Sequence, residues 1–183
     1  MVMLLRHLLS ILLLPTVVVI VVPYTLLRRT GLMIPLGSGG VLPWLRVSAG
    51  AVLLLGGFAL FAWSVGLFAW IGRGTLAPWD PTKRLVAVGP YQHVRNPMIS
   101  GVLLMLVGEA VLWGSRPVAI WAGTFLIINH VYFLLLEEPG LERRFGEAYR
   151  TYKAHVPRWI PRLRPWRDTS KGSCDEHHDR SAP

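Results

Sequence analysis

The amino-acid sequence predicts an all-α integral membrane protein with about four transmembrane helices. Of its 183 residues, 52% are hydrophobic and only 16% are charged, whereas a soluble domain carries about 25% charged residues. The apolar residues also form long uninterrupted runs, separated by loops rich in proline and glycine. We therefore expect one membrane domain over residues 1–165, followed by a disordered polar tail over 166–183.

The net charge of +9 indicates contact with membrane lipid rather than with nucleic acid. The basic residues cluster in loops and in the tail, beside apolar runs, where anionic lipid headgroups attract them. The aromatic interleaving of RNA-binding sheets is missing. The single cysteine, Cys174, lies in the polar tail, so the sequence predicts no disulfide framework and no metal site.

The first two predicted spans cover residues 8–27 and 47–71. A cleaved signal peptide is the alternative for the first. Its apolar stretch is, however, longer than the ~7–15 residues typical of such peptides, and no small-residue cleavage site follows. The second run is long enough to cross a bilayer with some tilt. Between the two, Thr30 to Trp44 is expected to form a flexible turn, because glycine and proline dominate it.

The next two spans, 98–113 and 118–136, are predicted to form a helical hairpin around a GSRP turn. Proline ends one helix and begins the next, so the two helices should be antiparallel. Arg95 stands before the hairpin, and Glu137 and Glu138 follow it. We therefore expect basic and acidic groups, far apart in sequence, to meet on one membrane face.

Two segments outside the spans complete the prediction. The polar loop 72–97 is long enough that a functional role is expected of it. Residues 137–156 are predicted to form one amphipathic helix on the membrane surface, because apolar residues recur every three or four positions. Most of the 19 Lys and Arg residues lie in the N-terminus, this loop and the C-terminus. Both termini should therefore be cytoplasmic.

Several polar residues lie in or beside the apolar runs, where ionisable groups are costly and often functional. They are Arg95, Asn96, Glu109, Asn129, His130, Glu137 and Glu138. Each also has a structural interpretation: Arg95 could extend to the interface, and Asn129 and His130 could hydrogen-bond between helices. We pair Arg95 with Glu137, because a guanidinium beside a carboxylate suits a zwitterion such as S-adenosylmethionine. The residues alone predict only a polar small-molecule site beside lipid.

Two stretches, GPYQHVRNPMISG and EEPGLERRFGEAYRTYKAHVPRWIP, resemble the superfamily of isoprenylcysteine carboxyl methyltransferases and phospholipid methyltransferases. The family pattern is GxYxxxRHPxYxG, an apolar hairpin, and EExxLxxxFGxxYxxYxxxVPR, and the likeness runs from about residue 74 to residue 161. It implies an integral membrane enzyme like isoprenylcysteine O-methyltransferase. Such an enzyme uses S-adenosyl-L-methionine to methylate a lipophilic acceptor, isoprenoid or phospholipid-like, at the cytoplasmic interface.

The resemblance also implies which residues hold the cofactor. The family's positions fall on Lys83, Arg84, Leu85, Val86, Tyr91, Arg95, Asn96, Pro97, Met98, Ile99 and Glu137. Arg95 is in addition the candidate catalytic residue. Three positions depart from the pattern: Asn96 replaces histidine, Ile99 replaces tyrosine, and Phe133 replaces the arginine that holds the substrate carboxylate in isoprenylcysteine enzymes. The last replacement argues against a prenylcysteine substrate.

Two alternatives stay open on the sequence. One is a non-enzymatic membrane protein of the same fold, which the replacements at Asn96 and Ile99 favour. The other is a membrane reductase that uses a nicotinamide dinucleotide, although the hairpin offers few cations for its phosphates. Neither the methyl acceptor nor the oligomeric state follows from the sequence.

Overall fold

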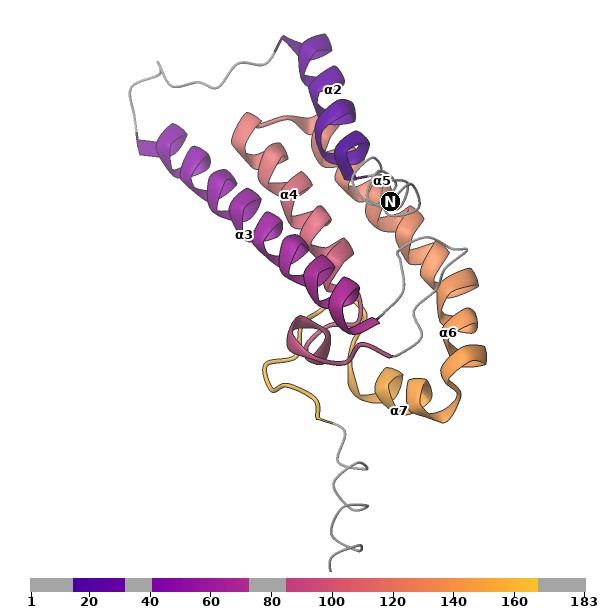
Figure 1. Ribbon diagram of the computed structural model, residues 1–183. Coiled ribbons are helices and arrows are strands. Elements are labelled where there is room, and N and C mark those ends of the chain that lie inside the picture. Colours follow the sequence, from indigo (N-terminus) through magenta and orange to yellow (C-terminus); the bar gives the residue numbers. More distant parts are fainter. Residues whose placement is uncertain (1–14, 32–40, 73–84, 168–183) are drawn as a thin grey trace, which may run out of the picture.

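The computed structural model describes residues 15–31, 41–72 and 85–167, and every regular element in these ranges is helical. This confirms the all-helical fold class. Helices α3 (Val41–Gly72), α4 (Pro97–Trp113) and α5 (Arg116–Tyr132) lie side by side and alternate in direction, and α2 (Val22–Thr30) packs against α5 (Figure 1). The short helices α6 (Glu138–Phe145) and α7 (Glu147–His155) lie at one end of this bundle (Figure 1).

Two helices are long and apolar enough to cross a membrane: Val41–Ile71 and Arg116–Phe145. Pro97–Trp113 is a shorter apolar helix. Large apolar side chains on α3 and α5 stay exposed, such as Leu55 at 66% and Ile127 at 65%, as expected for surfaces that face lipid. Four spans remain a prediction. Residues 8–14 of the predicted span 8–27 lie outside the described residues, and from Val17 onward that segment is helical.

Helix α3 begins at Val41, six residues before the predicted start. The sequence analysis placed Pro43 in a loop, but Pro43 lies in the first turn of the helix. The N–H groups of a first turn have no acceptor within the helix, so a proline costs little there.

The hairpin forms as the sequence predicted. Gly114 takes a left-handed conformation (φ 61°) after α4, which glycine adopts without strain. Ser115 then caps α5: its Oγ accepts a hydrogen bond from the backbone N–H of Val118 at 3.4 Å. Because the connection is so short, α4 and α5 must be antiparallel neighbours. Their facing residues enclose a core around Leu106, Ala122 and Phe125.

Glycines bring α3 and α4 into close contact. Gly50 and Gly57 on α3 face α4, and Gly101 and Gly108 on α4 face α3, so that both pairs repeat at a spacing of seven. A Cβ atom on Gly57 would lie 2.7 Å from the carbonyl oxygen of Gly101, and one on Gly101 would lie 2.8 Å from that of Gly57. Small residues of this kind allow two helix backbones to approach closely inside a membrane.

Helix α5 continues beyond its predicted end at 136 through a π-helical turn, η3 (Phe133–Glu137), into α6. In this turn the N–H of Glu138 donates to the carbonyl of Phe133, five residues earlier. The ring of Pro139 would clash with the carbonyl of Leu135 in a regular α-helix, and the wider turn avoids this clash. An equivalent π turn, η1 (Val17–Val21), precedes Pro23.

The predicted single helix 137–156 is two helices. Gly146, with φ 55° and ψ −128°, separates α6 from α7 and lets the chain turn sharply. Helix α7 buries the side chains of Tyr149 and Tyr152, and Val156, just beyond its end, joins them in a second small core. The apolar spacing in the sequence therefore predicted the buried positions but not the break.

Candidate functional site

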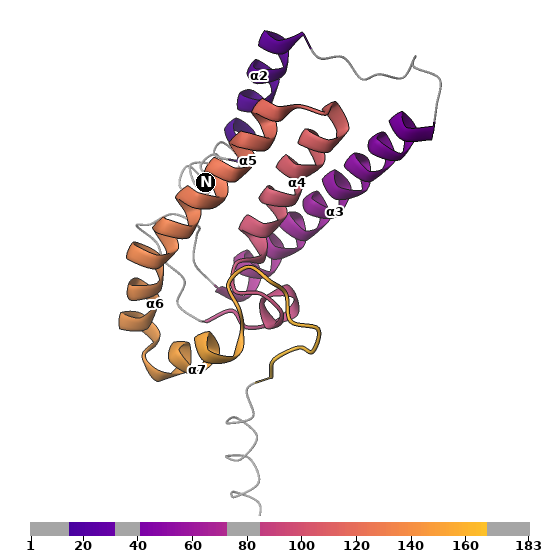
Figure 2. The same cartoon turned by 180° about the vertical axis from the view of Figure 1, so that it is seen from behind.

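The candidate site lies where three segments far apart in sequence meet, at the end of the bundle that holds α6 and α7 (Figure 2). The loop before α4, with its 3-10 turn η2 (Gly89–Gln92), runs alongside the chain that follows α7. Backbone hydrogen bonds join them: Arg95 N–H donates to Pro157 at 2.9 Å, and Arg162 N–H donates to His93 at 3.0 Å. The return of the chain after Val156 therefore fixes the position of the η2 loop.

Two buried tyrosines tie this loop to α7 and α3. The hydroxyl of Tyr152 donates to the backbone carbonyl of Tyr91 at 2.7 Å, and the hydroxyl of Tyr91 donates to the carbonyl of Ser64 on α3 at 3.5 Å. Burial raises the pKa of both tyrosine hydroxyls above its usual value, so both stay protonated and can donate. Tyr91, predicted to bind the cofactor, thus has its side chain buried against α3.

A buried carboxylate is the centre of the site. Glu138 Oε1 accepts from Arg95 NH1 at 2.8 Å and contacts Arg158 NH2 at 2.6 Å, while Oε2 lies 3.1 Å from Lys153 Nζ. The side chains of Arg95 and Glu138 are only 11% and 7% exposed. We call Glu138, Arg95, Lys153 and Arg158 the Glu138 cluster. It joins α6, α7, the η2 loop and the returning chain at one carboxylate.

The Glu138 cluster corrects one prediction. Arg95 pairs with Glu138 and not, as the sequence predicts, with the preceding residue Glu137. Glu137 is half-buried, and within the described part of the chain its carboxylate accepts a single long hydrogen bond, 3.5 Å, from the Tyr132 hydroxyl. Successive residues on a helix point about 100° apart, so only one of two adjacent glutamates can face the arginine.

Four of the other predicted cofactor residues lie at the start of α4: Asn96, Pro97, Met98 and Ile99. Asn96 precedes the helix, and its side chain makes no capping bond. Pro97 is buried at the first turn, Met98 is half-buried, and Ile99 packs against the core between α4 and α5. Val86 is buried, and Leu85 packs on the core that α7 forms. Lys83 and Arg84 lie outside the described residues.

Of the polar residues inside the predicted spans, His130 contacts the Glu138 cluster, whereas the contacts found for Asn129 and Glu109 among the described residues do not reach it. Asn129 donates to the carbonyl of Phe125 on its own helix at 2.8 Å, so this bond does not link two helices. Glu109 has a buried Oε2 atom with no hydrogen-bond partner. His130 contacts Arg158, a member of the cluster, through its Nδ1 at 3.4 Å, and accepts from Trp159 Nε1 at 3.0 Å.

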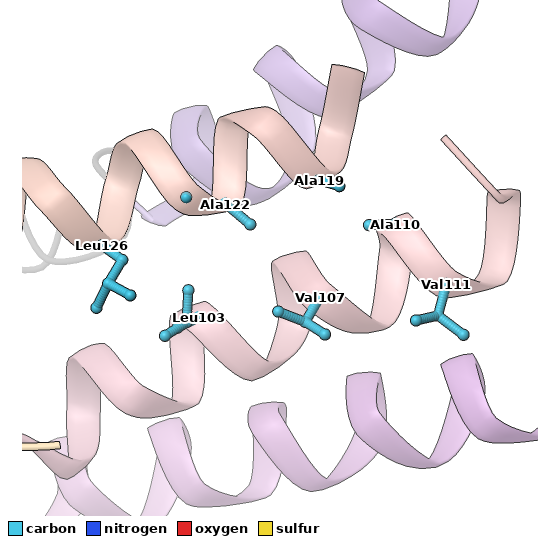
Figure 3. Close-up of a pocket in the computed structure, with 8 residues that line it drawn as sticks. Leu103, Val107, Ala110, Val111, Ala119, Ala122 and Leu126 are labelled. Atoms are coloured by element: carbon cyan, nitrogen blue, oxygen red, sulfur yellow. The ribbon is translucent and has the colours of Figure 1, made fainter. Parts of the chain in front are cut away.

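An apolar groove of about 380 Å³ lies between α4 and α5 (Figure 3). Only apolar or small side chains line it: Leu103, Val107, Ala110, Val111, Ala119, Ala122, Gly123 and Leu126. Figure 3 shows these side chains on the facing sides of the two helices, toward the GSRP turn. Because its lining side chains are apolar or small, the groove suits hydrocarbon.

Sequence reasoning did not assign Lys153 or Arg158 to the site. One available signal was a basic residue, Arg158, directly after the proline that follows α7. In the structure the carbonyl of this proline, Pro157, accepts from the Arg95 N–H, which brings Arg158 near Arg95. Another was charge balance. A glutamate buried at a helix junction needs more than one cation or hydrogen-bond donor near it. Lys153 and Arg158 are basic residues that meet this need at Glu138.

Comparison with known proteins identifies the family. The sequence model of the phospholipid methyltransferase family matches residues 45–148, more than half of the chain. Methanethiol S-methyltransferase from Pseudomonas deceptionensis is 32% identical over 77 residues, which cover 40% of this chain but only 27% of that enzyme. An uncharacterized protein of Haemophilus influenzae is 35% identical over 60 residues, 32% of this chain and 94% of that protein.

The matched residues include the α3–α4 pair, the hairpin, Arg95 and both glutamates. Two helices apolar enough to cross a bilayer agree with a family of membrane proteins. The chain belongs to the phospholipid methyltransferase family.

Proposed function

We propose that this protein transfers a methyl group from S-adenosyl-L-methionine to a lipophilic acceptor at the cytoplasmic membrane interface. One observation carries the proposal. Among the residues that the structure describes, the Nε of Arg95 is buried without a hydrogen-bond partner, and the carboxylate of Glu137, next to the cluster, accepts one long hydrogen bond. Buried donors are rarely left unpaired unless a ligand or water satisfies them.

These residues fit the cofactor. A ligand carboxylate would satisfy Arg95 Nε, which Glu138 leaves free. The Glu137 carboxylate suits an ammonium or a ribose hydroxyl, and the Asn96 amide, free of a capping bond, suits a further polar contact. Pro97, Met98 and Ile99 supply apolar contact at the start of α4. We also propose that Lys83 and Arg84 contact the cofactor, as the family resemblance implies.

When bound, S-adenosylmethionine supplies an electrophilic methyl group on a sulfonium. The protein's task is then alignment and the exclusion of water. The Glu138 cluster holds the η2 loop against α7, and so fixes Arg95 and Asn96 relative to Glu137. The lipid-facing surface of α5 gives an acceptor a route from the bilayer, and the apolar groove between α4 and α5 can hold its hydrocarbon. No residue needs to form a covalent bond.

Topology is part of the proposal. We infer that the chain is multi-pass, with both termini on the cytoplasmic side, because most basic residues lie in segments that four spans would place there. This topology can be checked by labelling single introduced cysteines in intact cells with a thiol reagent that cannot cross membranes. A tail residue that is labelled from outside intact cells would contradict it.

The test is binding followed by transfer. Purified protein should bind S-adenosylmethionine, and labelled methyl should enter a component of a total lipid extract. The Glu137→Ala variant should bind the donor more weakly and transfer less label, with thermal stability close to that of wild type. A wild type that binds no donor, under conditions where a family member does, refutes the proposal.

A non-enzymatic membrane protein of the same fold is the second candidate. The packing at two predicted cofactor positions favours this non-enzymatic candidate. Tyr91 is buried and Ile99 packs against the core, so these side chains serve the fold. It predicts that Asn96→Ala and Glu137→Ala leave the protein's cellular role intact, whereas a methyltransferase loses activity in both. The reductase alternative predicts binding of a nicotinamide dinucleotide, which the same binding assay can include.

A further inference from the structure

The non-helical chain that follows α7, residues 157–167, runs along the η2 loop (yellow in Figure 2), and we call it the strap. Two further hydrogen bonds add to the two backbone bonds described above. The backbone N–H of Trp166 donates to the Gln92 carbonyl at 3.1 Å. The His93 ring donates from Nδ1 to the Arg162 carbonyl at 2.7 Å, because a carbonyl can only accept. The strap and the η2 loop therefore hold each other in place.

One side of the strap faces the protein. Arg158, Trp159, Arg162 and Trp166 are half-buried. The Trp166 ring packs on Tyr152 of α7, with ring centroids 5.5 Å apart, and Arg158 belongs to the Glu138 cluster. These inward side chains attach the strap to the bundle from its first residues to its last.

The outward side of the strap combines two aliphatic side chains with two cations. Ile160 and Leu163 are 79% and 97% exposed, and Arg164 and Arg167 are exposed beside them. Within the described part of the chain, neither of these two arginines forms an ion pair. The strap itself contains no acidic residue. Its outward side is therefore apolar and cationic at once.

The strap begins beside the end of a candidate membrane span. Phe133 belongs to the apolar helix Arg116–Phe145, and the Trp159 ring lies 6.0 Å from the Phe133 ring. Tryptophan is typical of the boundary between hydrocarbon and lipid headgroups. Ile160 follows Trp159 directly, so we place the outward side of the strap at headgroup depth.

An anionic bilayer surface matches both parts of this outward side. Lipid phosphates attract Arg164 and Arg167, while Ile160 and Leu163 can reach the hydrocarbon below the headgroups. A nucleic acid would match the cations, but its phosphate backbone offers no hydrocarbon to the two aliphatic side chains.

We propose that the strap docks on an anionic phospholipid surface, and that this docking fixes the η2 loop and strengthens binding of the methyl donor. The η2 loop leads directly into Arg95 and Asn96, to which the proposed function assigns donor contacts. The effect on the donor therefore rests on the proposed function, whereas docking itself does not. A surface that already orders the strap leaves less conformational entropy to lose when the donor binds. Anionic lipid thus raises donor affinity without touching the donor.

Docking is measured in lipid nanodiscs with a nitrobenzoxadiazole label, whose emission depends on its surroundings. The label is attached at Pro165→Cys in a Cys174→Ser background, because Cys174 is the single native cysteine. One disc contains phosphatidylcholine alone, and the other contains equal parts of phosphatidylcholine and phosphatidylglycerol. In the anionic disc we expect blue-shifted emission and stronger quenching by nitroxide-labelled lipid.

Two variants and one control separate the contributions of charge and apolar contact. Arg164→Gln/Arg167→Gln should remove most of the difference between the discs, and Leu163→Ser should make the label shallower in the anionic disc. The control is Arg28→Gln/Arg29→Gln, which removes the same charge from exposed residues at the opposite end of the bundle (Figure 1). It should keep the full difference.

Three label results would overturn docking on lipid. The first is equal emission and quenching in both discs, which would mean that the outward side has another occupant, such as the acidic residues of the tail. The second is a difference that persists in Arg164→Gln/Arg167→Gln. The third is an equal blue shift when inorganic phosphate is added to the phosphatidylcholine disc, because a soluble anion would then suffice.

The effect on the site is measured in the same two discs by hydrogen exchange of the Arg95 amide and by titration with S-adenosylmethionine. In the anionic disc we expect slower exchange and donor binding about fivefold tighter, and Arg164→Gln/Arg167→Gln should lose both effects. Equal exchange in the two discs, or measurable donor affinity that is equal in both, overturns the coupling. A docked strap and slower exchange with no donor binding in either disc uphold the docking and refute the methyltransferase.

Discussion

Arg95 and Glu138 are 43 residues apart in sequence, yet their side chains form a buried ion pair of 2.8 Å. The hairpin brings the two ends of the α4–α5 unit to the same end of the bundle, and the π turn before Pro139 sets the direction in which Glu138 points. The ion pair therefore depends on both the hairpin and the π turn. Its removal is the first of four predictions.

Glu138→Ala should destabilise the protein by about 3–5 kcal/mol, because it leaves Arg95 and Arg158 buried without their counter-charge. Thermal unfolding in detergent measures the change. The matched control is Glu147→Ala on α7, whose 3.5 Å pair with Arg150 is exposed; its effect should stay below about 1 kcal/mol. Equal stability of the two variants would show that Glu138 does not hold these segments together.

Glu137→Ala should weaken donor binding about tenfold to a hundredfold while costing little stability, because Glu137 makes one long hydrogen bond with the residues that the structure describes. Isothermal titration with S-adenosylmethionine measures the affinity. Tyr132→Phe, which removes the same 3.5 Å bond but keeps the carboxylate, is the control and should bind close to wild type. A Glu137→Ala variant with unchanged affinity would mean that this carboxylate does not touch the donor.

Gly57→Ala and Gly56→Ala should have opposite effects on stability, although the two residues are neighbours on α3. A Cβ atom on Gly57 would lie 2.7 Å from the Gly101 carbonyl oxygen and 2.8 Å from the Met105 nitrogen, whereas one on Gly56 would meet nothing within 4 Å. Backbone atoms cannot move aside cheaply, so Gly57→Ala should cost about 1–3 kcal/mol.

Gly56→Ala should stabilise by up to about 1 kcal/mol, since alanine favours the helix. Both variants are measured by thermal unfolding under identical detergent conditions. Similar behaviour of the two would show that α3 and α4 do not approach as closely as the glycine spacing indicates.

Tyr152→Phe should destabilise by about 1–3 kcal/mol, because it leaves the buried carbonyl of Tyr91 without its 2.7 Å donor. Burial raises the pKa of Tyr152 in the folded state above the usual value of 10.0. A raised folded-state pKa contributes stability that is complete below pH 10 and is lost as pH rises above it. The difference between wild type and variant should therefore be constant at neutral pH and shrink above pH 10.

Tyr24→Phe, at a tyrosine that is 57% exposed on α2, is the control for Tyr152→Phe and should change stability by less than about 0.5 kcal/mol. A difference between wild type and Tyr152→Phe that grows above pH 10 would show that the Tyr152 hydroxyl is not the buried donor.

The sequence by itself determined the helical hairpin. It also determined that basic and acidic residues meet at the open end of the hairpin, where Arg95 precedes it and Glu137 and Glu138 follow it. Proline and glycine at the GSRP turn have strong local preferences, and the apolar runs leave few alternatives to helix in a membrane. The stretches GPYQHVRNPMISG and EEPGLERRFGEAYRTYKAHVPRWIP were also sufficient to point to the methyltransferase superfamily, which the family match confirms. The glycine spacing of seven was present in the sequence too, but the spacing alone does not name the partner helix.

Only the tertiary structure decided that Glu138, and not Glu137, holds Arg95. The choice depends on helix rotation, and the π turn at Phe133–Glu137 changes that rotation in a way that no local preference announces. The roles of Arg158, Trp159 and His130 were likewise hidden, because they require the chain after Val156 to return across the η2 loop. Local sequence sets which groups are charged or apolar; contacts between distant segments set which of them face each other, and these depend on the packing of the whole chain.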